Sequence, residues 1–237
     1  MFIQPDTVPM GLTPTAAPTL CSGRTRLQHI GVVLGGLRSW SARHQLPEGA
    51  ALSRAMACLL EIVHHCITRK TRRLTVFVFR DDIWPSTSRH NRNVAALTLR
   101  FLKATLTTLH AKGVQIRVTG DFANLHGSAR TLALQAEEIT VGNTGMELVI
   151  ALDGYQANLD DTCTTSSGWA RLPQPELVVR TGGHLPVAYP MFWDTSETAL
   201  YVTDLSWPEL DLNTFRAALQ WFRRPDRGSC SILPRMN

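Results

Sequence analysis

The segment Arg180-Thr181-Gly182-Gly183 places a cation, a hydroxyl group and two glycines directly after an apolar run. The preceding residues, Glu176–Val179, are largely apolar and β-branched, which is typical of a buried strand. A cation at the carboxyl end of a parallel strand, followed by glycines that let a ligand approach the backbone, can bind an anion. The same residues also fit a strand, a turn and a surface arginine. The pattern alone therefore indicates an anion site and leaves the plainer alternative open.

The acidic pair Asp81 and Asp82 is the second group that could do chemistry, and it follows the strand-like run Leu74–Phe79. Two carboxylates at the end of a strand invite a catalytic interpretation. The alternative is structural, because either aspartate can pair with Arg80 or cap a turn. Neighbouring side chains point apart if the strand continues, so the pair does not imply a shared metal site.

A framework of alternating strands and helices has to position these groups. The chain has 237 residues, enough for one sizeable α/β domain. Short runs rich in β-branched residues predict strands over residues 29–34, 74–79, 114–121, 146–152 and 176–179. Apolar residues at helical spacing predict helices over residues 48–70, 91–112, 126–139 and 215–222.

Composition and charge narrow the class of protein. A hydrophobic content of 44% with 18% charged residues fits a soluble globular protein. The net charge of +5 is compatible with anionic ligands such as diphosphates. No arginine-lysine run is interleaved with aromatic residues, so we expect no nucleic-acid partner. No run of 18 or more apolar residues occurs, so we expect no transmembrane segment.

The cysteines and the first residues of the chain point to the cytoplasm. The five cysteines show no C-x-x-C spacing, which predicts reduced thiols and no zinc site. Residues 1–26 repeat Pro and Thr but lack a charged start followed by an apolar core. We expect them to be a flexible leader and not a signal peptide.

Several motifs together resemble those of the cis-prenyltransferases, the undecaprenyl diphosphate synthase family. They are Arg180–Gly183 after its strand, the apolar Met191–Trp193, Leu200–Asp204 and the pair Trp207-Pro208. The resemblance implies a single α/β domain over residues 27–228, with a mostly parallel central sheet flanked by helices, a hydrophobic tunnel and a tail at 229–237. It also implies an isoprenoid ligand and a homodimer, with a heterodimer of homologous chains as the alternative.

The resemblance also assigns the site residues. The positions that match the family's diphosphate-binding motifs are Arg180, Thr181, Gly182, Gly183, Arg38, Gly36 and Trp40. The loop that contains Asp81 and Asp82 resembles the family's loop beside the substrate. The residues expected to line the apolar pocket are Leu37, Phe79, Trp84 and Phe101.

The chain departs from the family where the family holds magnesium. The catalytic aspartate falls on Gly35, and the metal-binding glutamate falls on Ala199. Neither residue offers a metal ligand, so we predict no metal-ligand residues, although Mg²⁺ stays open as a cofactor. The resemblance also implies that a helical segment, which the family has after the strand ending near Asp153, is deleted in this chain. Its loss should open one side of the domain, unless a partner or the leader covers that side.

Three functions are compatible with these matches and departures. The first, which we favour, is a repurposed isoprenoid enzyme, such as a terpene or prenyl cyclase, that no longer elongates with isopentenyl diphosphate. In it Asp81 or Asp82 is the acid, with its pKa raised beside an apolar tunnel, and Arg180 holds the anion. The second is a non-catalytic partner subunit of a heteromeric cis-prenyltransferase. The third is a short-chain prenyltransferase that condenses allylic diphosphates.

Overall fold

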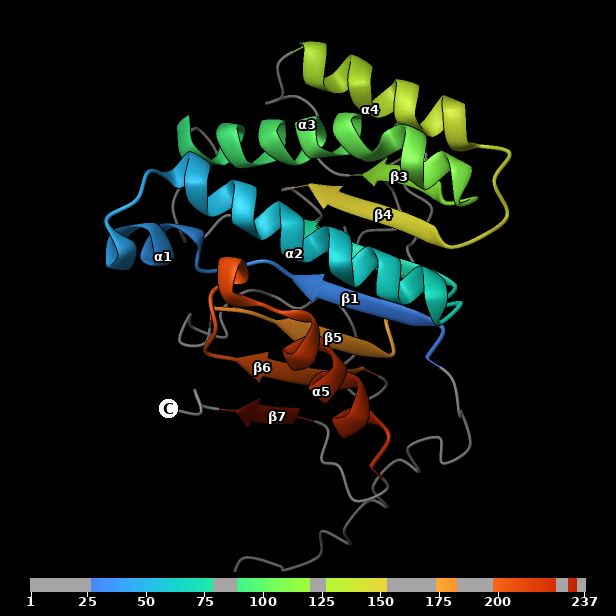
Figure 1. Ribbon diagram of the computed structural model, residues 1–237. Coiled ribbons are helices and arrows are strands. Elements are labelled where there is room, and N and C mark those ends of the chain that lie inside the picture. Colours follow the sequence, from blue (N-terminus) through green and yellow to red (C-terminus); the bar gives the residue numbers. More distant parts are fainter. Residues whose placement is uncertain are drawn as a thin grey trace, which may run out of the picture.

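The computed structural model describes residues 27–78, 89–119, 127–152, 174–182, 198–224 and 230–233. These residues form a seven-stranded sheet with the order β3-β4-β2-β1-β5-β6-β7. The strands are β1 (His29–Val33), β2 (Arg73–Val78), β3 (Gln115–Thr119), β4 (Glu147–Leu152), β5 (Leu177–Arg180), β6 (Ala199–Thr203) and β7 (Cys230–Leu233). Every neighbouring pair is parallel, so all strands end at the same edge of the sheet (Figure 1).

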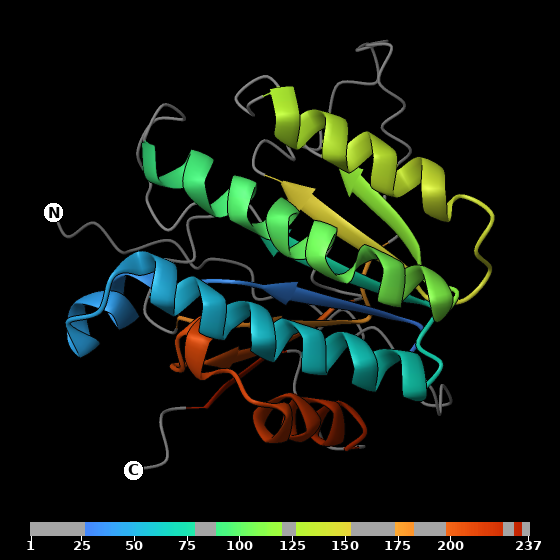
Figure 2. The ribbon, with the colours of Figure 1, turned by 45° about the horizontal axis from the view of Figure 1, so that its top comes forward.

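Helices cover the face of the sheet that is turned toward the viewer in Figure 1. They are α1 (Leu37–His44), α2 (Glu48–Thr68), α3 (Arg89–Ala111), α4 (Gly127–Thr140) and α5 (Leu212–Phe222), with a 3-10 turn, η1 (Trp207–Glu209), before α5. The helices α2 and α3 run side by side across the sheet, and α4 packs on α3 and β3 (Figure 2). The turn η1 packs against α1 and α2.

The central strands β1 and β5 are buried on both faces, as expected within a parallel sheet, whereas the edge strand β3 alternates between buried and half-buried residues. Alternate residues of β1, Ile30 and Val32, join the large core beneath the helices. The residues of opposite parity face the other way, where Phe77, Ala151 and Val178 form a second, smaller cluster. This two-residue period fixes the register, because a slip by one residue would exchange the two faces.

The long helix α2 is a core helix. Among the described residues it is the one helix whose length and hydropathy would suit a membrane span, but half of that window is buried inside the protein. Its inward residues recur at helical spacing and belong to the large core; they are Ala51, Leu52, Ala55, Met56, Leu59, Ile62, Val63 and Cys66. Burial of this stripe against the sheet accounts for its apolar character.

The predicted α/β fold with a mostly parallel sheet is confirmed. Four elements were not anticipated: α1, β6, η1 and β7. The helix α1 has only 8 residues and follows Gly36 without a side-chain cap, so its start lacks the usual sequence signal. The strand β7, Cys230–Leu233, lies inside the segment 229–237 that was expected to be a tail. It pairs with β6 at the sheet edge, a contact that four residues do not reveal by periodicity. The predicted leader and the region of the apparent deletion lie outside the described residues.

The packing of α5 generates a stability prediction. Phe215 is fully buried in the large core, whereas Gln220 lies exposed on the same helix. Phe215→Ala should lower the free energy of unfolding by about 3–5 kcal/mol, because it leaves a cavity. Gln220→Ala should change it by less than about 0.5 kcal/mol. Urea denaturation monitored by circular dichroism measures both, and equal effects would contradict the placement of α5.

Candidate anion site at the carboxyl edge of the sheet

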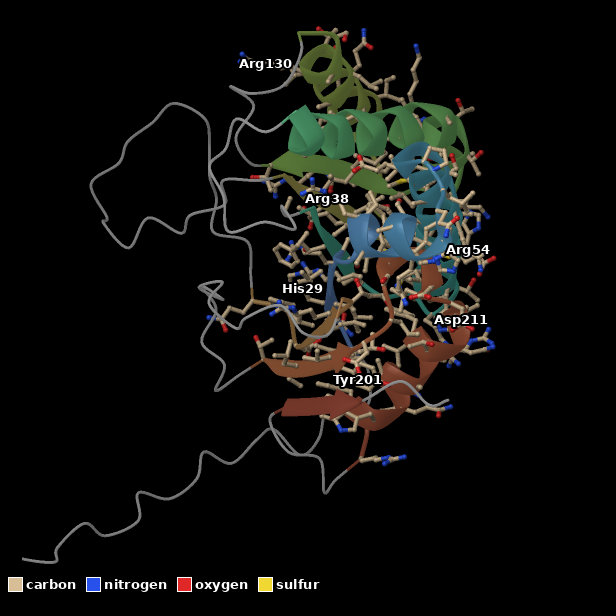
Figure 3. The ribbon with its side chains drawn as sticks, turned by 90° about the vertical axis from the view of Figure 1, so that its left-hand side faces the viewer. His29, Arg38, Arg54, Arg130, Tyr201 and Asp211 are labelled. Carbon is tan, nitrogen blue, oxygen red and sulfur yellow. The ribbon has the colours of Figure 1, made fainter. Side chains whose placement is uncertain are left out.

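Three strand ends meet at the carboxyl edge of the sheet, in what we call the carboxyl-edge junction: residues 34–36 after β1, 180–182 at the end of β5, and 205–207 after β6. Backbone hydrogen bonds join them. The N–H of Gly182 donates to the carbonyl of Leu205 at 2.7 Å, and the N–H of Trp207 donates to the carbonyl of Gly35 at 2.9 Å. Figure 3 views the molecule from this edge.

The side chain of Thr181 ties β5 to the end of β1. Its hydroxyl accepts a hydrogen bond from the N–H of Gly35 at 2.9 Å. It can donate to the carbonyl of Val33 or of Gly35, each at 3.2 Å. Thr181 is fully buried, so this hydroxyl satisfies a backbone donor that water cannot reach. In this structure Thr181 therefore stabilises the junction by hydrogen bonds to the backbone of Gly35 and Val33.

Two glycines permit the close approach of the strand ends. Gly36 and Gly182 have φ angles of 83° and 86°, in the left-handed region that residues with a Cβ rarely adopt. A Cβ on Gly182 would lie 3.1 Å from the carbonyl carbon of Gly35 and 3.1 Å from the nitrogen of Gly36. A Cβ on Gly36 would lie 2.9 Å from the hydroxyl oxygen of Ser206. Both positions therefore require glycine.

The helix α1 starts at the junction. Gly36 occupies its N-cap position, and its first turn carries no acidic side chain. The N-terminus of a helix carries partial positive charge and offers backbone N–H groups, an arrangement that favours anions. Arg38 lies in this first turn, about half exposed and 3.9 Å from Glu48. The start of α1 therefore adds to a positive environment at the edge.

Arg180 is the last residue of β5 and is only 6% exposed. It pairs in register with Val33 of β1 on one side and Val202 of β6 on the other, so its Cα lies at the carboxyl edge. A guanidinium keeps its charge at all physiological pH values, and burial makes acceptors for its hydrogen bonds necessary. The sequence-based placement of a cation at the end of this strand agrees with the structure.

The structure brings several predicted site residues together. Gly36, Arg180, Thr181 and Gly182 belong to the junction. The predicted pocket residues Leu37 and Phe101 pack in or against the large core, and Trp40 is buried in that core and stacked on His44, with ring centroids 4.2 Å apart. The remaining predicted site residues lie outside the described residues and stay predictions; they are Phe79, Asp81, Asp82, Trp84 and Gly183. The hydrophobic tunnel is likewise still a prediction.

The two residues at which the resemblance places the family's metal ligands have no metal-ligating side chain. Gly35 has no side-chain oxygen, and Ala199 starts β6 in register with Leu177, three residues before the position that pairs with Arg180. Three residues of strand span about 10 Å, so Ala199 lies toward the opposite edge of the sheet. Within the described part of the chain no three His, Cys, Asp or Glu residues cluster at metal-ligand spacing. We therefore derive no step through a metal.

The thiols and histidines of α2 are structural. Burial raises the pKa of the Cys66 thiol to about 12 and also raises the pKa of Cys58. Burial, followed by the nearby Arg216 and Arg69, lowers the pKa of His65. The thiols of Cys58 and Cys66 therefore stay protonated and His65 stays neutral at physiological pH.

Sequence reasoning missed a set of polar side chains around η1. Arg43 donates to the Ser206 hydroxyl at 2.8 Å and to Glu209 at 3.1 Å. Arg54 of α2 donates to the carbonyl of Pro208 at 2.9 Å. A signal was present, because Ser206-Trp207-Pro208-Glu209 has the S-x-x-E spacing of a capping box.

Thr181 can be tested by removing only its hydroxyl. Thr181→Val keeps the shape but leaves the Gly35 N–H buried without an acceptor, which should lower the free energy of unfolding by about 1–3 kcal/mol. Thr181→Ser keeps the hydroxyl and should cost about 1 kcal/mol through the lost methyl group. Urea unfolding of both variants measures these losses. A valine variant as stable as the wild type would show that the hydroxyl does not stabilise the junction.

The destabilisation expected from Gly182→Ala has two parts, backbone strain and steric clash, which a comparison with Gly113 separates. Gly113 also has a positive φ, 70°, but nothing lies within 4 Å of a Cβ built there. Gly113→Ala should therefore lose only the conformational term, about 1–2 kcal/mol. Gly182→Ala should lose at least about 1 kcal/mol more, because its Cβ meets backbone atoms of Gly35 and Gly36. Equal losses in urea unfolding would show that the strand ends do not approach so closely.

Known proteins resemble this chain in both sequence and fold. The family model described as undecaprenyl diphosphate synthase matches residues 33–161 and 153–229. An isoprenyl transferase of Nitrosomonas europaea is 26% identical over 238 residues, covering 92% of this chain and 90% of that protein. An isoprenyl transferase of Chromobacterium violaceum is 28% identical over 215 residues, covering 84% of each.

The fold has a solved counterpart. The crystal structure of lavandulyl diphosphate synthase from Lavandula x intermedia, in complex with dimethylallyl diphosphate, superposes with a TM-score of 0.69 at 16% identity. The match covers 86% of this chain and 98% of that one. It supports the shared fold, and the family model adds the sequence relationship over most of the chain. The chain belongs to the undecaprenyl diphosphate synthase family, the cis-prenyltransferases.

Proposed function

We propose that this chain is an isoprenoid enzyme that holds a prenyl diphosphate at the carboxyl-edge junction and rearranges the prenyl chain without elongating it. The observation that carries this proposal is the buried Arg180 at the junction, next to a loop in which the position of the family's metal-holding aspartate is Gly35. A cation and a helix N-terminus favour the diphosphate in the ground state. Ionisation of an allylic diphosphate would need further charge to stabilise the leaving group.

A protonation-initiated cyclisation needs no such ionisation. Asp81 or Asp82, as the protonated acid, would donate its proton to an alkene carbon of the prenyl chain. A second alkene would then attack the resulting cation and form a carbon–carbon bond. The product cation would lose a proton to a carboxylate, so the product is an isomer of the substrate and still carries its diphosphate. An apolar surrounding would raise the pKa of the acid and keep it protonated near neutral pH.

Prenyl transfer between allylic diphosphates is the second candidate. Two observations favour it: the relatives are named isoprenyl transferases, and the lavandulyl diphosphate synthase was solved with dimethylallyl diphosphate. In that reaction a carbon–oxygen bond breaks, pyrophosphate leaves and a carbon–carbon bond forms to the second substrate. Release of pyrophosphate thus separates the two functions.

A non-catalytic subunit is the third candidate. It would pair with a homologous chain, whereas the enzyme functions are compatible with the homodimer that the family resemblance implies. Co-purification of a homologous chain, together with no turnover of any isoprenoid, would favour this candidate.

The substrate test uses the purified full chain. Geranyl, farnesyl and geranylgeranyl diphosphate are each incubated with and without Mg²⁺ and isopentenyl diphosphate, and the products and free pyrophosphate are measured. We expect an isomer of one substrate, no pyrophosphate, no need for isopentenyl diphosphate, and one deuterium incorporated when the reaction runs in D₂O. Magnesium-dependent release of pyrophosphate would replace this proposal with prenyl transfer.

The acid assignment is tested separately at each aspartate. Asp81→Asn or Asp82→Asn should lower kcat by about 100-fold or more, because general acid catalysis contributes about 10²–10⁴-fold. Glu138→Gln, which removes a charge from an exposed position of α4, is the matched control and should leave kcat unchanged. Full activity in both asparagine variants would show that neither carboxyl group is the acid.

A further inference from the structure

The short turn η1 is linked to the junction by three contacts. The N–H of Trp207 donates to the carbonyl of Gly35 at 2.9 Å. The side chain of Ser206 lies against Gly36, since a Cβ on Gly36 would be 3.0 Å from the Ser206 Cβ. The residue before this turn, Leu205, accepts the hydrogen bond from Gly182. A displacement of η1 would therefore move the glycines on both sides of the junction.

Glu209 and Arg43 hold η1 against α1. One oxygen of Glu209 accepts from the N–H of Ser206 at 2.9 Å and from the Arg43 guanidinium at 3.1 Å. The same guanidinium nitrogen donates to the hydroxyl of Ser206 at 2.8 Å. Arg43 lies in the last turn of α1. It therefore connects the C-terminal end of this helix to Ser206, which packs against the N-cap residue Gly36. We call Arg43, Ser206 and Glu209 the η1 clamp.

The turn is also anchored to α2. The Nε of Arg54 donates to the carbonyl of Pro208 at 2.9 Å, and the thiol of Cys58 lies 3.8 Å from the same oxygen. The helix α1 also packs on α2 through Leu37 and Trp40 in the large core, and the clamp adds a second connection that holds α1 relative to the ends of β1 and β5. Arg43 and Glu209 thus reach the N-cap residue of α1, Gly36, through Ser206.

We propose that Arg43 and Glu209 are positioning residues of the anion site, which act through Ser206 on Gly36 and the start of α1. This inference rests on the proposed function, because it assigns the anion to the junction. Arg43 and Glu209 have side chains that are 41% and 20% exposed, so water screens their ion pair and it adds little to global stability. Their loss should therefore change the affinity for an anion more than the stability of the fold.

The chain offers a matched control at the opposite edge of the sheet. Arg117 lies 3.2 Å from Glu147, with side chains 39% and 12% exposed, so this pair resembles that of Arg43 and Glu209 in separation, and the two arginines are equally exposed. Glu147 is the first residue of β4 and so lies at the amino edge. Arg117→Gln removes the same charge as Arg43→Gln without touching the junction.

Titration calorimetry with inorganic pyrophosphate tests the inference on the full chain. Arg43→Gln and Glu209→Gln should each raise Kd by about 10-fold, because a small displacement of binding groups weakens every contact they make. Arg117→Gln should change Kd less, and Arg43→Lys should recover part of the affinity that Arg43→Gln loses. The variants of Arg43 and Glu209 should unfold at temperatures close to that of the control variant Arg117→Gln.

The outcomes separate the inference from the proposed function. A wild-type chain that binds no pyrophosphate contradicts the proposed anion site. A wild-type chain that binds it, with Arg43→Gln and Glu209→Gln as tight as the wild type, overturns the positioning role alone. Hydrogen exchange of the peptide that covers Gly35–Trp40 gives a readout that needs no ligand. It should be faster in the two clamp variants than in Arg117→Gln, and equal exchange in all three also overturns the positioning role.

Discussion

The buried hydroxyl of Thr181, placed between the N–H of Gly35 and the carbonyls of β1, is the contact on which the carboxyl edge depends. A parallel sheet leaves the backbone groups beyond each strand end without ladder partners, and groups that are buried must find them elsewhere. Here a side chain supplies the acceptor for Gly35. The hydrogen bonds from Gly182 and Trp207 close the rest of the junction. Because these contacts are short and mutually dependent, the three strand ends form one unit.

Close approach of these strand ends explains the glycines at the junction. Gly36 and Gly182 adopt left-handed conformations, and each faces atoms that leave no room for a Cβ. The same close packing brings the N-terminus of α1 and the guanidinium-bearing end of β5 to one place. The N-terminus of α1 and the backbone of Arg180 thus lie at the carboxyl edge of the sheet, which is where ligands of open α/β sheets bind. The anion site follows from the way the strands terminate.

The family fold is retained, whereas the two residues at which the resemblance places the family's metal ligands, Gly35 and Ala199, are not carboxylates. The framework needs apolar strands and helices with the right period, and these tolerate many substitutions. Metal binding needs carboxylate oxygens at particular positions, and Gly35 and Ala199 have none. A fold can therefore persist after the chemistry on it has changed. The retention of Arg180 at a buried strand end is compatible with continued anion binding.

Much of the framework could be predicted from the order of residues. The strands over 29–34, 74–79 and 146–152 and the helix over 48–70 came from local periodicity, because burial on one or two faces imposes a period of 3.6 or 2. The Arg-Thr-Gly-Gly motif likewise indicated a strand end with a cation. Helix α1 and strands β6 and β7 escaped prediction, since eight residues without a cap and strands of five and four residues carry too little periodic signal.

Residue type and local period were enough to predict most of the alternation of strands and helices and the cation at the end of β5. Only the tertiary structure decided which segments meet. In it the N–H of Gly35 donates to the hydroxyl of Thr181, and Ser206 packs against Gly36. Arg43 binds Glu209, which lies 166 residues away in the sequence. Contacts between residues so far apart depend on the order of strands in the sheet, and local periodicity carries no information about that order.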